Sequence, residues 1–398
     1  MKEEKINILI VGQGVCVTAL AKKLSAHSRV EKIYATCKNY SGNNELFEIV
    51  DIREDNPTEL LRFCLENKIN LSIPLSEKSI KSDIVSFFQE NEQSVFAPTK
   101  NAGRIVTDKV FGKKFLYKIK TKTSKFGVFD KITAAIDFLN SSNFPVIINT
   151  NDNSALKQKN ILYTTIKPAV SFLNNVINYE SEKDILIEEY IFGHHFTIYY
   201  VTDGYSALPI TTVANYKFSK NDDCGEYGEE YGAFAPDYKI DTEIMCKLNN
   251  IMDNVLKNLE NAGNPYLGIL GMDCVVSREG ELYINGFKNF MEECSCPVVL
   301  DIIEEDLIEL INSCINGYFS DEYNEIKTND YAGIGIRATS SSPITEINDE
   351  IDFLSEEMKS CILYKKGATL KSAKNFLYEE LEHFGNNIKY RTDIAQTK

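Results

Sequence analysis

Short apolar runs of strand type alternate with amphipathic helical patterns over the first hundred residues of this chain. The first run, Ile6–Val11, leads through Gly12-Gln-Gly14 into a helical pattern at residues 17–24. Further strand-type runs at 32–36, 70–74 and 95–96 alternate with helical patterns at 57–67 and 82–90. Strands that alternate with helices in this way form a parallel sheet with helices packed on its faces. The alternation therefore predicts a doubly wound α/β domain at the start of the chain.

The remainder of the chain carries longer patterns and no internal repeat. Helical patterns lie at 108–117, 131–139, 169–178, 242–262, 306–317 and 371–383. Strand patterns lie at 145–148, 157–165, 185–190, 196–202, 267–276, 281–284 and 332–337. An acidic stretch, from Asp222 and Asp223 to Glu229 and Glu230, lacks the spacing of a calcium loop. We expect it to be a solvated loop rather than a cation site.

Composition argues against several functional classes. The net charge is −15 and no tract is rich in Lys and Arg, which disfavours nucleic acid as a partner. No apolar run reaches the ~18 residues that a membrane helix needs, and the start of the chain leads directly into a strand, without a signal-peptide pattern. The ten cysteines have no regular spacing, which is typical of free thiols in a reducing compartment. We expect a cytoplasmic monomer that binds neither nucleic acid nor membranes.

Seven segments, taken in order, resemble the motifs of one enzyme family. They are Ile8-Leu-Ile-Val-Gly12-Gln-Gly14, Ser94-Val-Phe-Ala-Pro98-Thr99-Lys100, Asp108-Lys109-Val-Phe-Gly-Lys-Lys-Phe-Leu116, Leu186-Ile-Glu188-Glu189-Tyr190-Ile191, Tyr231-Gly-Ala-Phe-Ala-Pro236, Tyr266-Leu-Gly-Ile-Leu-Gly-Met272 and Lys389-Tyr-Arg-Thr-Asp-Ile394. In this order and nearly this spacing they resemble phosphoribosylamine–glycine ligase, a family of the ATP-grasp superfamily. The resemblance covers essentially the whole chain.

The resemblance implies an α/β chain with the ATP-grasp fold and four parts. These are an N-terminal Rossmann-like domain (1–104), a lid and first ATP-grasp subdomain (105–190), a main ATP-grasp subdomain (191–328) and a C-terminal α+β domain (329–398). The family reaction uses ATP and Mg²⁺ to make glycyl phosphate, from which the amine of phosphoribosylamine displaces the phosphate. Carried over by motif, the nucleotide-binding residues are Lys109, Lys157, Glu188, Glu189, Tyr190 and Ile191. The substrate-binding residues are Gly14, Glu77, Lys217, Asp223 and Gly225.

The chain departs from the family pattern where the triphosphate would bind. The family's second lysine falls on Asn149, its ribose-binding acid falls on His195, and its lid motif falls on residues 152–159, which contain no glycine. Its magnesium-binding Glu and Asn fall on Asn285 and Phe287. An amide is a poorer magnesium ligand than a carboxylate, and Phe is none. Only Asn285 and Glu292 remain as candidate metal ligands.

These departures leave two hypotheses for the function. In the first, the chain is a pseudo-ligase that has lost or altered the catalysis and binds a small molecule or an unknown protein through the old cleft. In the second, it is a divergent, active ATP-dependent carboxylate–amine ligase. Phosphoryl transfer relies on positioning and on cations around the phosphates, so joint loss of the second lysine and the metal pair favours the first hypothesis.

Three other motifs have simpler explanations than a cofactor site. Gly12-Gln-Gly14 lacks the third glycine of a dinucleotide fingerprint, so we expect a tight strand-to-helix turn. His194 and His195 are adjacent on a predicted strand, so their side chains should point to opposite faces. Cys294 and Cys296 have no His nearby in sequence, and we expect buried thiols rather than a zinc or redox site.

Overall fold

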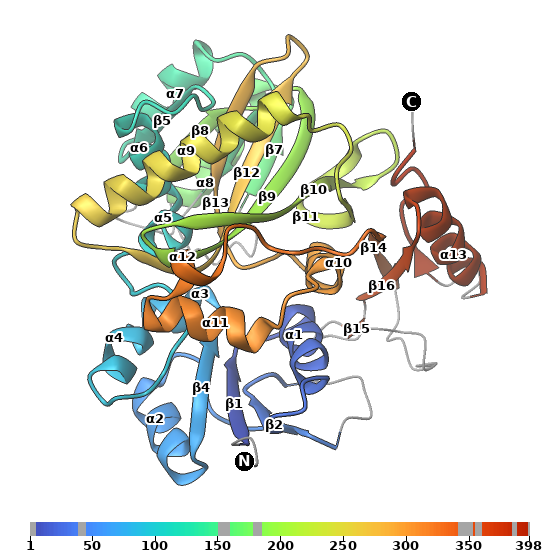
Figure 1. The fold of residues 1–398 in the computed structure, drawn as a ribbon. Coiled ribbons are helices and arrows are strands. Elements are labelled where there is room, and N and C mark those ends of the chain that lie inside the picture. Colours follow the sequence, from blue (N-terminus) through green and yellow to red (C-terminus); the bar gives the residue numbers. More distant parts are fainter. Residues whose placement is uncertain are drawn as a thin grey trace.

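The N-terminal part of the computed structural model is a four-stranded parallel sheet with helices on both faces (Figure 1). Residues 5–38, 45–149, 160–177, 185–340, 353–354, 360–383 and 388–396 are described. The strand order is β3-β2-β1-β4, from β1 (Ile6–Val11), β2 (Val30–Ala35), β3 (Phe47–Ile49) and β4 (Ile69–Pro74). The predicted strand at 95–96 is reduced to a single parallel bridge between Ser72 and Val95.

The alternating side chains of β1 explain why helices cover both faces of this sheet. Ile8 and Ile10 pack in the same core as α1 (Val15–Ser25), while Leu9 and Val11 pack with α2 (Pro57–Glu66) and α4 (Ile84–Gln89). A strand buried on both faces reads as a continuous apolar run, as it does here. The expected doubly wound N-terminal domain is therefore confirmed.

A second, smaller sheet is antiparallel and has the order β5-β8-β6-β7. Its strands are β5 (Phe126–Phe129), β8 (Ile185–Glu189), β6 (Val146–Asn149) and β7 (Asn160–Tyr163). Helices α7 (Ile132–Asn140) and α8 (Ile166–Ile177) supply the rest of its small core. Residues 150–159, which carry the predicted phosphate lid with Lys157, lie outside the described residues.

The largest sheet runs through the second half of the chain in the order β13-β12-β9-β10-β11-β14-β16-β15, with β17 also paired to β14. Its strands are β9 (Gly193–Gly204), β10 (Ala207–Lys220), β11 (Cys224–Ala235), β12 (Tyr266–Ser277), β13 (Leu282–Asn289), β14 (Ala332–Ser340), β15 (Phe353–Leu354), β16 (Ser360–Gly367) and β17 (Ile388–Lys389). Because β14 pairs with β11, the sheet continues without a break into the C-terminal segment. The domain boundaries themselves stay a prediction.

Helices cover both faces of this large sheet. One face packs against α5 (Arg104–Thr107), α6 (Lys109–Lys118) and the long α9 (Thr242–Asn261). The other packs against α10 (Ser295–Ile302), α11 (Leu307–Asn316) and α12 (Phe319–Glu322), which also contact the N-terminal domain. At the C-terminal end, α13 (Leu370–His383) covers β14 and β16. Figure 1 shows the blue N-terminal domain below this layer and the red C-terminal elements to one side.

One expectation for this region was wrong. The acidic stretch expected as a solvated loop forms the first half of β11, and only the turn residues before it are outside a strand. Glu229 is exposed while Glu230 is buried, as the period of two in a strand requires. The sequence pattern did not indicate a strand here, because carboxylates are rarely buried without partners and the partners of Glu230 lie far away in the sequence.

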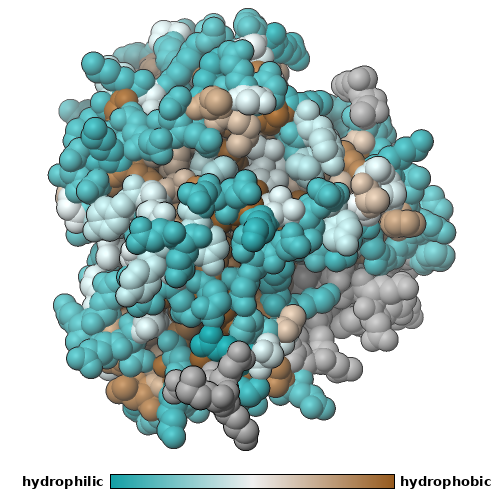
Figure 2. Space-filling model, viewed as in Figure 1, coloured by the Kyte–Doolittle hydropathy of each residue, from teal (hydrophilic) through white to brown (hydrophobic). Residues whose placement is uncertain are grey.

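The outer surface matches the acidic composition. The face shown in Figure 2 is mostly hydrophilic, with apolar side chains exposed in small separate places. None of the described helices is both long and apolar enough to cross a membrane. The ten cysteines are all free, and Cys294 and Cys296 are fully buried, as expected.

Candidate functional site

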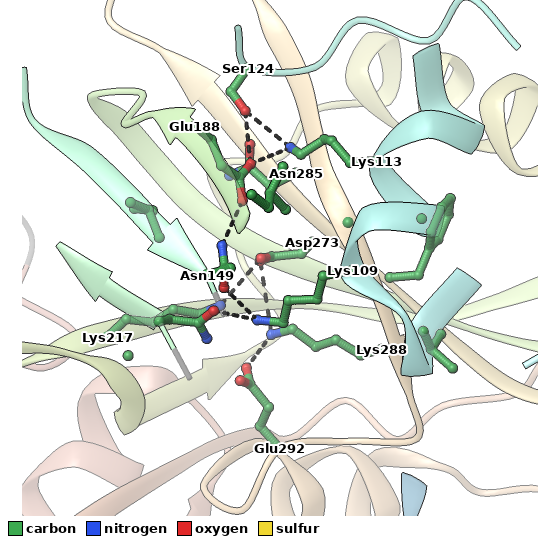
Figure 3. Close-up of a pocket in the computed structure, with 18 of the residues that line it drawn as sticks. Lys109, Lys113, Ser124, Asn149, Glu188, Lys217, Asp273, Asn285, Lys288 and Glu292 are labelled. Carbon is green, nitrogen blue, oxygen red and sulfur yellow. Dashed lines mark hydrogen bonds and ion pairs between the residues drawn. The ribbon is translucent and has the colours of Figure 1, made fainter. Parts of the chain in front are cut away.

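A cavity of about 310 Å³ lies between the small sheet and the large sheet. Its walls come from α6, β6 and β8 on one side and from β10, β12 and β13 on the other (Figure 3). Polar and charged side chains from all of these elements point into it. The cavity is therefore assembled from segments that are far apart in the sequence, and we call it the cleft.

Lys109 is the first residue of α6, and its ammonium group lies in the cleft. The Asp108 side chain caps the helix by accepting a hydrogen bond from the backbone N–H of Phe111 (2.9 Å), which fixes where α6 begins. The ammonium donates to Oδ1 of Asn149 (3.4 Å) and to Oδ1 of Asn160. No carboxylate among the described residues forms an ion pair with it, and desolvation of the ammonium by the cleft walls lowers the pKa of Lys109. The side chain is nevertheless exposed, so an anion that enters the cleft can reach this ammonium.

Glu188 is fully engaged with neighbouring side chains, although it lines the cleft. Its carboxylate pairs with the buried ammonium of Lys113 (2.6 Å) and accepts from Ser124 (3.0 Å) and from Nδ2 of Asn149 (3.1 Å). Asn149 therefore bridges Glu188 to Lys109, at the position where the family pattern has a second lysine. The network fixes the cleft end of β8 relative to α6.

The residues after Glu188, for which the family resemblance implies a hinge, lie at the cleft wall. Glu189 also lines the cleft and pairs with Lys125 (2.9 Å). Tyr190 stacks on the ring of His195, with centroids 5.3 Å apart, and the carbonyl of Ile191 accepts from Nε2 of His195 (3.1 Å). Burial lowers the pKa of His195 to about 4, so the ring is neutral at pH 7. A neutral ring that donates through Nε2 keeps only Nδ1 as an acceptor, whereas a ribose-binding carboxylate accepts through two charged oxygens.

Two further lysines share two carboxylates at the other side of the cleft. Lys217 on β10 pairs with Oδ2 of Asp273 on β12 (3.3 Å). Lys288 on β13 pairs with Glu292 and lies 3.9 Å from Oδ1 of Asp273. Burial opposes charge on Asp273, but the two lysines outweigh it and hold the pKa of this carboxyl below its usual range. The pKa of Lys217 is raised well above its usual value, because the Asp273 and Glu292 carboxylates outweigh its burial. The Asp273 and Glu292 carboxylates are therefore ionised, and the ammonium groups of Lys217 and Lys288 already neutralise their charge.

The two positions of the family's magnesium pair do not present metal ligands. Asn285 is the extra residue of a β-bulge, since Cys274 pairs with Ile284 and the next residue, Asp273, pairs with Gly286. Phe287 is turned into the core, where its ring packs against Phe115 at 6.3 Å.

Magnesium does not fit the side chains that remain. Hard cations need several free oxygen ligands, whereas Asp273 and Glu292 are held by ammonium groups. In the described part of the chain, no three His, Cys, Asp or Glu side chains are grouped to hold a metal ion. Asn285 and Glu292 both line the cleft, but the structure gives them no shared third ligand.

The expected substrate residues are split between two places. Glu77 and Lys217 line the cleft. Asp223 lies instead in the turn between β10 and β11, where it pairs with the buried Arg391 of the C-terminal segment (3.0 Å), and Gly225 lies at the start of β11. Gly14 has a positive φ of 77°, and a Cβ there would lie 2.9 Å from Oε1 of Glu293.

A buried carboxylate occupies the junction behind Gly14. The Glu230 side chain accepts from the backbone N–H groups of Cys294 (2.7 Å) and Ser295 (2.9 Å) at the start of α10, and from Nδ2 of Asn215 (2.7 Å). Next to it, Arg337 donates to Glu293 (2.6 Å) and to the carbonyl of Glu230 (3.0 Å). Burial and the nearby Glu292 raise the pKa of Glu230 to about 7. The hydrogen-bond donors at this junction are therefore already occupied by the carboxylates of Glu230 and Glu293.

Sequence reasoning missed several cleft residues. They are Lys113, Asp273 and Lys288, and each is a charged residue inside an otherwise apolar helix face or strand. A single charged residue in an apolar pattern was the one indication in the sequence that these side chains face a polar cavity. The predicted cleft residues Lys109, Glu188, Tyr190 and Lys217 do lie together.

A parallel α/β domain, a small antiparallel sheet and a large sheet enclosing a lysine-lined cleft define an ATP-grasp protein. Two sequence families match the chain. The N domain of phosphoribosylglycinamide synthetase matches residues 6–105, and the ATP-grasp (A) domain of the same enzyme matches residues 107–290. The chain belongs to the phosphoribosylglycinamide synthetase, or phosphoribosylamine–glycine ligase, family.

Individual relatives cover nearly the whole chain. The phosphoribosylamine–glycine ligase of Caldanaerobacter subterraneus subsp. tengcongensis is 27% identical over 421 residues, which covers 98% of this chain and 99% of that protein. The enzyme of the same name from Fusobacterium nucleatum is 28% identical over 316 residues, covering 78% and 74%.

Solved structures support the fold. The phosphoribosylamine–glycine ligase of Thermotoga maritima superposes with a TM-score of 0.75 at 15% identity, covering 98% of this chain and 100% of that one. A biotin carboxylase from Campylobacter jejuni, solved as a beta-gamma-ATP complex, has a TM-score of 0.70 at 13% identity, with 95% of this chain and 91% of that one covered. The expected fold class and family are thereby confirmed.

Proposed function

We propose that this chain binds a purine nucleotide in the cleft and does not join a carboxylate to an amine. The observation that carries the binding is Lys109. Its side chain is exposed and lines the cleft, and among the described residues its ammonium has two amide oxygens as hydrogen-bond partners and no carboxylate. A phosphate group would supply the missing negative charge through a charge-assisted hydrogen bond.

The wall beside Lys109 suits an adenine ring. Ile147, Leu186, Ile191 and Val106 line the cleft there, next to the hinge backbone. Nucleotide pockets combine apolar walls with a few fixed polar groups. The Lys113–Glu188 pair holds this wall in place without exposing a charge to the base.

The cleft opposes ligation for a reason that is independent of binding. Forming an acyl phosphate requires cations that hold the triphosphate while a carboxylate attacks it. Here the metal-ligand positions carry a bulged Asn285 and a buried Phe287, and the remaining carboxylates are paired with lysines. The cleft offers a nucleotide the Lys109 ammonium and an apolar wall, whereas magnesium does not fit the side chains as they are arranged.

One observation favours the alternative, a divergent carboxylate–amine ligase. Asp273 and Glu292 both face the cleft, and a metal that displaced Lys288 from them would gain two carboxylate ligands. The acceptor side argues against this alternative, because Glu230 and Glu293 already occupy the hydrogen-bond donors at the junction. We therefore propose a small-molecule-binding protein that acts as a monomer in the cytoplasm.

Calorimetric titration with ADP tests the binding. We expect one site per chain, and Lys109→Met should weaken it by about 10- to 100-fold, the value of a hydrogen bond to a charged group. Lys118→Met is the matched control, because Lys118 is exposed on the same helix and does not line the cleft. Absence of ADP binding at millimolar concentration, or equal affinity in the Lys109 and Lys118 variants, would refute the proposed function.

A further inference from the structure

The ammonium of Lys288 lies among oxygens that would otherwise suit a metal ion. It donates to Oγ1 of Thr197 (3.1 Å), pairs with Glu292 and lies 3.9 Å from Oδ1 of Asp273 (Figure 3). The Lys288 side chain is 14% exposed and that of Asp273 is 20% exposed. The group is therefore a largely buried cation with two carboxylate partners.

The bulge in β13 brings Lys288 to this position. Residues after the bulge alternate between faces, so Phe287 turns into the core and Lys288 turns into the cleft. Gly286 between Asn285 and Phe287 leaves open space, since a Cβ there would meet no atom within 4 Å. The strand that carries the family's metal pair thus presents a lysine to the cleft instead.

The charges around Lys288 are balanced by one cation in addition to Lys217. Desolvation opposes charge on Glu292, whose side chain is 27% exposed, but the ammonium groups of Lys217 and Lys288 outweigh it and lower the pKa of this carboxyl. Lys217 also pairs with Asp273. Without Lys288, Lys217 alone would face two partly buried carboxylates, which is the arrangement that recruits a divalent cation.

We propose that the Lys288 ammonium permanently replaces the divalent cation of this cleft as the charge partner of Asp273 and Glu292. The inference rests on the proposed function and deepens it, because it implies that nucleotide binding in this cleft needs no magnesium. Its first test, however, uses the metal alone, without nucleotide.

That test is Mn²⁺ binding followed by electron paramagnetic resonance of the free ion. We expect the wild-type protein to show no Mn²⁺ binding in the cleft and Lys288→Ala to bind one ion, with a Kd about tenfold or more below the highest Mn²⁺ concentration at which wild type shows none. Adding Asp273→Asn to Lys288→Ala should abolish the gain. Lys122→Ala is the matched control, because it removes an ammonium from the exposed pair with Glu281 (2.5 Å) without joining two carboxylates.

Lys288→Arg keeps a cation in place and should bind no Mn²⁺, even if Lys288→Ala proves unstable. The inference is overturned if wild type or Lys288→Arg binds one Mn²⁺ that Asp273→Asn removes, or if a folded Lys288→Ala binds none. As a second measurement, the Kd of wild type for ADP should agree within about twofold in excess Mg²⁺ and in EDTA. Failure to bind ADP at all would refute the proposed function and leave the metal result standing.

Discussion

Glu230 gives the stability of this protein a distinctive pH dependence. Its pKa lies at about 7 in the folded chain, against an ordinary value of 4.5, because it is buried and lies near Glu292. Between these two values the folded state keeps a proton that the unfolded state has lost. The contribution of Glu230 to stability is therefore complete below pH 4.5 and disappears as the pH rises through 7. At about 1.4 kcal/mol per tenfold change in proton affinity, the full loss over 2.5 pH units is about 3.4 kcal/mol.

The substitution Glu230→Gln isolates this effect. Its amide does not titrate, so the difference in unfolding free energy between wild type and variant should fall by about 2.5 kcal/mol from pH 5 to pH 8, because part of the effect is already lost at pH 5. His195 has its pKa lowered to about 4 by burial, so it adds stability as the pH rises towards 6.5 in both proteins, and it cancels in the difference. Urea unfolding at half-unit pH steps measures this difference, with Glu229→Gln, the exposed neighbour, as control. A difference that stays constant from pH 5 to pH 8 would refute the reasoning.

Other changes have expected outcomes that urea unfolding checks. Lys113→Met should destabilise the chain by about 3 kcal/mol, because it leaves the Glu188 carboxylate buried without its cation; a loss under about 1 kcal/mol would contradict the pairing. Arg391→Ala should cost about 3 kcal/mol or more, since its guanidinium is buried and joins the C-terminal segment to the β10–β11 turn. The exposed Arg53→Ala should leave stability unchanged. Phe287→Asn should cost about 3 kcal/mol by placing an amide in an aromatic core, and it should not create Mn²⁺ binding while Lys288 remains.

Much of the fold was predictable because its signals are local. The continuous apolar run of β1 and the flanking helical patterns indicated a parallel sheet, and α9 was visible from its amphipathic period. The turn Gly12-Gln-Gly14 also agrees, with α1 starting at the next residue. These features depend on neighbours in sequence, which a single chain displays directly.

The site was less accessible because its partners come from distant strands. The sequence shows that Asn285 and Phe287 replace metal ligands, but not that Lys288 turns towards Asp273. That contact depends on the bulge between Ile284 and Gly286, which shifts the register of β13 by one residue. Glu230 was misplaced for the same reason, because its donors come from α10, more than sixty residues away.

Substrate-dependent turnover of ATP is the most direct test of the central claim. Purified protein is incubated with Mg²⁺, ATP, glycine and phosphoribosylamine, and ADP and glycinamide ribonucleotide are measured by mass spectrometry. The phosphoribosylamine–glycine ligase of Caldanaerobacter subterraneus serves as a parallel reference. We expect the reference to form both products and this chain to form neither above the blank, although it binds ADP. Formation of glycinamide ribonucleotide that depends on both substrates would contradict the account.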